Sequence, residues 1–220
     1  MTTRKTPAPA TRTPVIPQAR PERANDSAQR ARTYRLLLSE AMNLVRRGRI
    51  PSVAEVAQSA CVSRATAYRY FPSRSKLITA VVEESLGPVR RFEAQATDGQ
   101  QRMRELFDKT FPRFKEFEPH LRAALQLSLE HQSLERAGRL EEEPYRRGHR
   151  REILGRALAP LKTELGARAY DRLIKSLSVI YGIEPYVILK DIWGSSDREV
   201  ESIARWMVDA LIESALRQTH

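Results

Sequence analysis

Apolar residues recur every three or four positions along the chain from Asn25 almost to the C-terminus. This spacing places the apolar side chains on one face of an α-helix, whereas the alternating runs typical of β-strands are scarce. Gly48 is a plausible end for the first such helix. Its apolar stripe consists of Tyr34, Leu37, Leu38, Ala41, Leu44 and Val45. The pattern therefore predicts an all-α protein.

The same spacing predicts the later helices. Glu141–Glu143 and Pro144 should form a charged, solvated connection between two of them. Ser195 or Ser196 can cap the final helix, with Glu199 in its first turn. The expected helices cover residues 74–97 (with a kink or break at Gly87-Pro88), 100–117, 119–131, 146–159, 166–191 and 196–217.

Charge is distributed unevenly along the chain. Residues 1–80 carry fifteen Lys and Arg against four Asp and Glu, whereas residues 81–220 are balanced, so the whole net charge of +11 lies in the first part. This asymmetry predicts a polyanion partner for that part alone. Five prolines and few large apolar side chains predict a disordered basic tail over residues 1–24. The tail either lies along DNA phosphates or is a solvated leader.

Two short helices are expected directly after the first long one. Ser52 and Glu55 match a capping box, in which each side chain accepts a hydrogen bond from the other residue's backbone N–H. Ser63 can cap the second helix, and Ala67 and Phe71, four residues apart, should face inward. These signals predict a helix-turn-helix, although two capped helices with a tight turn can also be a plain helical hairpin.

The outward face of the second short helix has the chemistry of a major-groove helix. Arginine pairs bidentately with guanine, and hydroxyl groups reach bases or phosphates. Arg74 and Lys76 follow at the start of the next helix, where free backbone N–H groups suit a phosphate. The candidate DNA contacts are Ser52, Val53, Ser63, Arg64, Thr66, Tyr68, Arg69, Tyr70, Arg74 and Lys76. A DNA-binding domain is therefore expected over residues 25–80.

Residues 33–82 resemble the DNA-binding domain of TetR-family transcriptional regulators. The segment from Ser52 to Leu77 carries the resemblance, and Tyr68-Arg-Tyr-Phe71 is its most specific part. The resemblance implies a three-helix head on a helical body that forms a homodimer, holds a small-molecule effector and acts as a repressor. The positions that match family DNA contacts are Ser52, Val53, Thr66, Tyr68, Arg69 and Tyr70.

Two positions depart from the family pattern. Arg74 stands where lysine is usual, which keeps a cation for phosphate binding. Cys61 stands in the turn where glycine is usual, and a left-handed conformation there would cost a non-glycine residue about 1 kcal/mol or more. This lone cysteine is either a redox sensor or, as we favour, a small buried residue.

Residues 81–220 are expected to form the effector-binding and dimerisation domain. The last helix carries two apolar stripes, which suggests that one serves the core and the other a partner, although a helix buried within one subunit is the alternative. The expected interface residues are Leu177, Ile188, Ala204, Val208, Leu211 and Ala215. A two-fold dimer would present two recognition helices about 34–36 Å apart, or a multiple of this, to a pseudo-palindromic site.

The effector site is less well defined by the sequence. Phe107, Phe111 and Phe114 share one helical face, and either line a cavity or pack as ordinary core. Glu184 lies in an apolar face near Tyr181, where it can bind a polar group of the ligand or pair across the dimer. These five residues are the candidate ligand contacts.

The sequence contains no motif typical of an enzyme. The four histidines lack metal-ligand spacing, and no nucleotide-binding glycine pattern occurs, so no catalytic residue, metal or cofactor is predicted. The single cysteine and the lack of an apolar leader or membrane-spanning run predict a cytoplasmic protein. The alternative to a specific regulator is an architectural DNA-binding protein without sequence preference.

Overall fold

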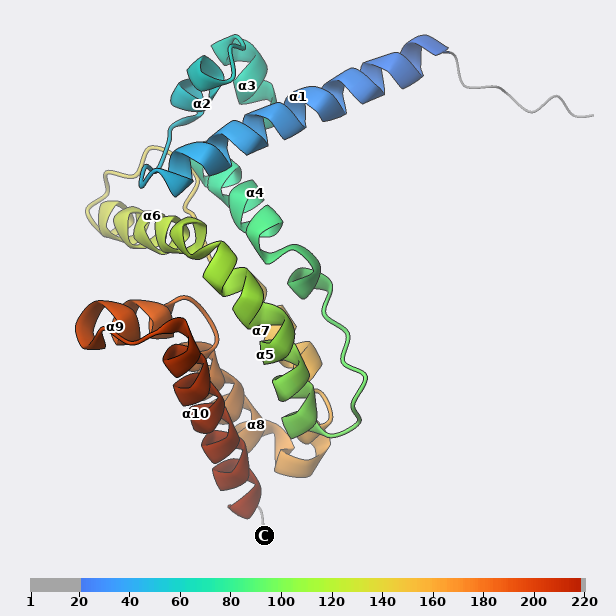
Figure 1. The fold of residues 1–220 in the computed structure, drawn as a ribbon, viewed down its shortest axis with the longest axis vertical. Coiled ribbons are helices and arrows are strands. Elements are labelled where there is room, and N and C mark those ends of the chain that lie inside the picture. Colours follow the sequence, from blue (N-terminus) through green and yellow to red (C-terminus); the bar gives the residue numbers. More distant parts are fainter. Residues whose placement is uncertain (1–20, 219–220) are drawn as a thin grey trace, which may run out of the picture. The chain divides into compact units, whose positions relative to one another are not determined.

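A computed structural model describes residues 21–218, and these residues form helices joined by turns and loops, with no β-strand among them (Figure 1). The predicted all-α class is therefore confirmed for this part of the chain. Among the described residues, 21–35 belong to one compact unit and 36–218 to another. Most of the predicted tail, residues 1–20, lies outside the described residues.

The first helix, α1, spans Pro21–Arg46. It begins four residues before the expected Asn25, and a proline is compatible with a first helical turn because its missing N–H would have no partner there. In the second unit, Leu37, Ala41 and Val45 are buried along the predicted stripe. The stripe thus forms the inner face of the C-terminal part of α1.

Three helices follow, and each begins at a serine cap, as the sequence predicted for the first two. They are α2 (Val53–Ser59), α3 (Arg64–Tyr70) and α4 (Arg74–Leu86). The side chains of Ser52, Ser63 and Ser73 accept hydrogen bonds from backbone N–H groups of the respective first turns. These bonds satisfy donors that a helix cannot pair internally, so the serines fix where each helix starts.

The remaining elements make up the larger part of the second unit. They are η1 (Gly87–Arg91), α5 (Gly99–Glu116), α6 (Glu118–Arg136), α7 (His149–Ala157), α8 (Leu161–Ile180), α9 (Glu184–Trp193) and α10 (Asp197–Arg217). α10 packs against α5, α8 and α9, while α4 packs against α5 and α6. Ser196 caps α10 by accepting from the N–H of Glu199 at 3.3 Å, as expected.

Two predicted helices are shorter than the sequence pattern indicated. The helix expected over residues 74–97 breaks at Gly87-Pro88, one of the two outcomes expected there, because Gly87 has φ 51° and the chain continues only as the 3₁₀ turn η1. The helix expected over 166–191 is divided into α8 and α9 by an extended Tyr181. Helix α9 begins at Glu184, and Pro185, which cannot donate to a preceding turn, is its second residue. Within the described residues, no helix is both long and apolar enough to cross a membrane.

Candidate functional site

The start of α2 is held by a complete capping box. The backbone N–H of Ser52 donates to Glu55 Oε2 at 2.7 Å, and the N–H of Glu55 donates to Ser52 Oγ at 3.2 Å. The hydrogen bonds from Ser52 lower the pKa of Glu55 and keep it ionised. Val53, a candidate DNA contact, is buried with Val56, so its side chain supports the core.

The exposed face of α3 is basic and aromatic. Ala67 and Phe71 are buried, as predicted, and turn Arg64, Tyr68 and Arg69 toward solvent. Thr66 is half-buried, and its hydroxyl accepts from Ser63 Oγ at 2.9 Å. Tyr70 is also half-buried.

The two exposed cations of α3, Arg64 and Arg69, have no acidic neighbours. The helix sequence, Arg-Ala-Thr-Ala-Tyr-Arg-Tyr, contains no carboxylate. Among the described residues, none places a carboxylate within 4.0 Å of the charged group of Arg64 or Arg69. Both guanidinium groups are therefore available to an external anion.

The start of α4 is already occupied by carboxylates of the same chain. Glu142 accepts from the backbone N–H of Arg74 at 2.9 Å, and Glu130 lies 3.0 Å from the Arg74 guanidinium. Lys76 pairs with Glu143 at 3.1 Å. The site predicted for a DNA phosphate thus holds Glu142, and the interpretation of residues 141–143 as a solvated run was wrong for Glu142, whereas Glu141 and Glu143 are exposed.

The turn between α2 and α3 contains one residue in the left-handed conformation, which glycine adopts more readily than other residues. Cys61 has φ 55° and is the only non-glycine residue with positive φ among the described residues. Its N–H donates to Gln58 O at 3.2 Å, and the N–H of Val62 donates to Ala57 O at 3.0 Å, which closes the end of α2. The side chain is exposed, so the expectation of a buried cysteine was wrong.

Replacing Cys61 with glycine should therefore stabilise the protein. Removing the Cβ from a left-handed residue relieves about 1 kcal/mol of strain, of which the greater freedom of the unfolded glycine cancels part. We expect a gain of about 0.5 kcal/mol in the free energy of unfolding, measured by urea denaturation. Gln58→Gly, at an exposed helical position, should instead cost about 1 kcal/mol. A loss of stability in Cys61→Gly would contradict this prediction.

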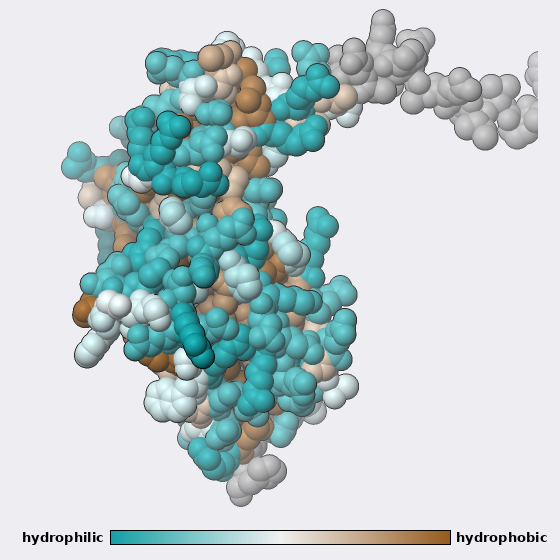
Figure 2. Space-filling model, viewed as in Figure 1, coloured by the Kyte–Doolittle hydropathy of each residue, from teal (hydrophilic) through white to brown (hydrophobic). Residues whose placement is uncertain are grey.

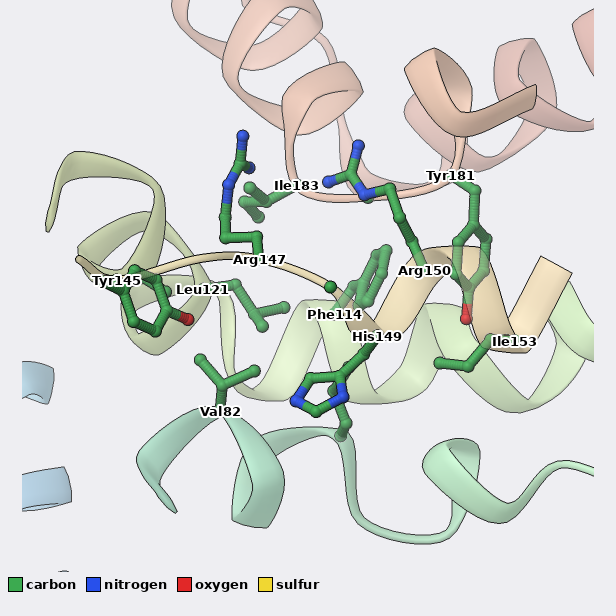
Figure 3. A pocket seen from close by; sticks show the side chains of 14 residues that line it. Val82, Phe114, Leu121, Tyr145, Arg147, His149, Arg150, Ile153, Tyr181 and Ile183 are labelled. Atoms are coloured by element: carbon green, nitrogen blue, oxygen red, sulfur yellow. The ribbon is translucent and has the colours of Figure 1, made fainter. Parts of the chain in front are cut away.

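A cavity lies among α4, α5, α6, α7 and the segment that joins α8 to α9. Protein atoms leave about 560 Å³ free there, part of it open to solvent. Its walls are mainly apolar, and Figure 3 shows the side chains of Arg147 and Arg150 at the side formed by the segment that carries Ile183. The lining residues are Val82, Leu86, Phe114, Leu121, Ala124, Tyr145, Arg147, Gly148, His149, Arg150, Ile153, Tyr181, Gly182 and Ile183.

Only two of the five candidate ligand residues line this cavity, Phe114 and Tyr181. Phe107 and Phe111 pack behind it, with ring centroids 4.9 Å apart, as part of the hydrophobic core. The hydroxyl groups of Tyr181 and Thr110 form a hydrogen bond of 3.1 Å between their oxygens. Burial raises the pKa of the tyrosine to about 12. Its hydroxyl is therefore neutral at physiological pH.

Glu184 pairs within its own chain. Arg150 Nη2 lies 2.9 and 2.8 Å from its two carboxylate oxygens, and Arg147 Nη1 lies 2.6 Å from one of them. Burial opposes ionisation of this carboxyl, but the hydrogen bond and charge of Arg150, with the charge of Arg147, lower its pKa overall. Sequence reasoning missed both arginines because nothing in the basic run of Arg146, Arg147, Arg150 and Arg151 distinguishes a paired arginine from a solvated one.

Most of the predicted dimer-interface residues are buried within the single chain. Leu177, Ala204, Val208 and Ala215 belong to its hydrophobic core, so their assignment to a partner surface was wrong. Of the two apolar stripes of α10, the one with Val200, Ala204, Val208 and Ala215 faces the core, where α10 packs on α5 and α8. The other stripe, with Ile203, Met207 and Leu211, is half-buried. Ile188 is exposed and Leu211 is half-buried.

The exposed apolar side chains of α8, α9 and α10 include only Ile188 of the residues predicted for the dimer interface. Among the described residues, α8, α9 and α10 carry five of the eight large apolar side chains that are exposed. Both tryptophans of the chain are in this set, 74% and 72% exposed. Figure 2 shows brown and white residues between teal ones over α9 and α10. We call this set the apolar surface of α8–α10: Val179, Ile188, Ile192, Trp193 and Trp206.

No protein-family model matches this chain, and no curated protein matches it significantly. Within the described residues, no cluster of three or more His, Cys, Asp or Glu side chains is arranged to hold a metal ion.

Proposed function

We propose that this protein is a transcriptional regulator of the TetR type that binds a pseudo-palindromic DNA operator as a homodimer. The observation that carries the proposal is the exposed face of α3, where Arg64, Tyr68 and Arg69 project without acidic neighbours. Such a face can enter a major groove, where arginine and hydroxyl groups read base edges. We assign the protein to the cytoplasm, where a DNA operator is accessible.

Further support comes from the way in which α3 is fixed. Ser63 caps its start, and buried Ala67 and Phe71 anchor its inner side. A helix that reads DNA must hold its side chains in a fixed register, because misplacement by about 1 Å weakens bidentate contacts. α3 is short, and this anchoring compensates for the weak stability of an isolated seven-residue helix.

The dimer is proposed to form through the apolar surface of α8–α10. Tryptophan is enriched at the energetic centres of protein interfaces, and leaving two of them exposed to water would be unfavourable. A second copy of the chain supplies a surface of the same chemistry under two-fold symmetry. This dimer would present two copies of α3 to the operator.

We further propose that the protein acts as a repressor and that a small molecule in the cavity releases it from DNA. The cavity wall and the start of α4 are linked by one short segment. Glu142 holds the backbone of Arg74, and three residues later Tyr145 lines the cavity. A ligand that shifts this segment would shift α4, which directly follows α3, and so would change the affinity for the operator.

Selection of bound duplexes from a random library tests the function. A specific regulator should enrich two inverted half-sites whose centres lie about 34–36 Å apart or a multiple of this distance. The selected duplex should bind about 10³-fold or more tightly than random DNA at the same salt concentration. An architectural protein would bind all duplexes alike, and a protein without DNA function would enrich none.

A further inference from the structure

The arginines at the edge of the cavity carry more charge than their acidic partner neutralises. Arg147 and Arg150 share the single carboxylate of Glu184, so the three side chains carry a net charge of +1. All three are largely buried, with side-chain exposures of 27%, 23% and 24%. His149 adds no charge at neutral pH, because burial and the charge of Arg90 lower its pKa.

Gly182 leaves the space that the Arg150 and Glu184 side chains occupy. A Cβ at Gly182 would collide with both the Arg150 guanidinium and the Glu184 carboxylate. Arg150 is also fixed by donation to Ser178 O at 2.6 Å. Arg150 thus donates hydrogen bonds to both Ser178 and Glu184, whereas Arg147 donates to Glu184 through Nη1 alone. The remaining donors of Arg147 can reach another acceptor.

Resting on the proposed function, we propose that this cavity binds a small amphipathic carboxylate, whose apolar body lies among the apolar walls and whose carboxylate is bound by Arg147 and Arg150. Val82, Phe114 and Ile153 provide the apolar contacts. A carboxylate accepts charge-assisted hydrogen bonds from guanidinium groups, and the net positive charge excludes a cationic ligand. A second anion therefore competes with or joins Glu184.

The position of the arginines explains how such a ligand would be sensed. Arg147 lies two residues after Tyr145, whose N–H donates to His131 Nδ1 at 3.1 Å. On the other side of Tyr145, Glu143 accepts from Ser75 Oγ of α4 at 2.6 Å through its carbonyl oxygen. A carboxylate that draws Arg147 away from Glu184 thus pulls on the segment that holds the first turn of α4.

Calorimetric titration of the full-length protein tests the ligand class. The probes are phenylacetate and octanoate, each paired with its uncharged carboxamide. We expect the acids to bind about 10- to 100-fold more tightly than the amides, which is the range for hydrogen bonds to a charged group. Amides that bind as tightly as acids, or acids that fail to bind at millimolar concentration, would overturn the inference.

Two matched arginine variants localise the binding. Arg147→Gln should weaken acid binding about tenfold or more and leave amide binding unchanged. Arg146→Gln removes an exposed neighbour that pairs with Glu135 outside the cavity, so it should change neither affinity. Equal behaviour of the two variants, or a parallel loss of acid and amide in Arg147→Gln, contradicts a carboxylate site at Arg147.

The proposed function and the ligand class can fail separately. Acids that bind as expected but leave the affinity for a selected duplex unchanged would support the cavity assignment and contradict the regulatory role. A palindrome selected by a protein that binds none of the acids would overturn the ligand class alone.

Discussion

Trp206→Glu should convert the protein from a dimer to a monomer and weaken its binding to a selected palindromic duplex by about 100-fold or more. The tryptophan is 72% exposed on α10, and a charge there would be buried without a partner in a dimer interface. Joining two DNA-binding heads in one dimer strengthens binding by roughly 10²- to 10⁴-fold, and a monomer loses this gain. Sedimentation velocity and equilibrium duplex binding measure the two effects.

Leu129→Glu is the matched control for this experiment. Leu129 is also exposed and apolar, at 56%, but it lies on α6, outside the apolar surface of α8–α10. Its replacement should leave both the dimer and the duplex affinity unchanged. A Trp206→Glu protein that remains dimeric, with an unchanged thermal melting temperature, would place the dimer interface elsewhere.

Arg69→Ala should weaken binding to the selected duplex by about 10- to 100-fold, while changing the affinity for random DNA only about twofold. A good bidentate contact to a base contributes about 1–3 kcal/mol of discrimination, whereas one phosphate contact adds little sequence preference. The Arg69 side chain is exposed on α3, so its removal leaves the buried anchor of Ala67 and Phe71 intact. Competition titrations at fixed salt concentration measure both affinities.

Arg146→Ala provides the charge control, because it also removes one exposed positive charge but lies between α6 and α7. Its effect on both duplexes should be small. If Arg69→Ala weakens the selected and the random duplex equally, Arg69 contacts phosphates only, and base reading must come from other side chains of α3.

The sequence predicted local structure well where the decisive forces act within one helical turn. A serine whose side chain accepts from the backbone N–H three residues later determines where a helix begins, and the caps at Ser52 and Ser63 were predicted in this way. For the final helix the sequence allowed Ser195 or Ser196, and the structure selects Ser196. The inward positions of Ala67 and Phe71 likewise follow from helical spacing. Helix ends were less predictable, because α8 stops at Ile180 although the apolar pattern continues.

The sequence by itself thus determined the all-α class, the capped helices from Ser52 to Phe71 and the residues that α3 exposes, since each depends on neighbours in the chain. Only the tertiary structure decided which stripe of α10 is buried, since both stripes are apolar. It also brought Arg147 and Arg150 into contact with Glu184, which is 34 or more residues away in the sequence, and placed Glu142 at the start of α4. Contacts of this kind depend on the packing of whole helices, which no local spacing encodes.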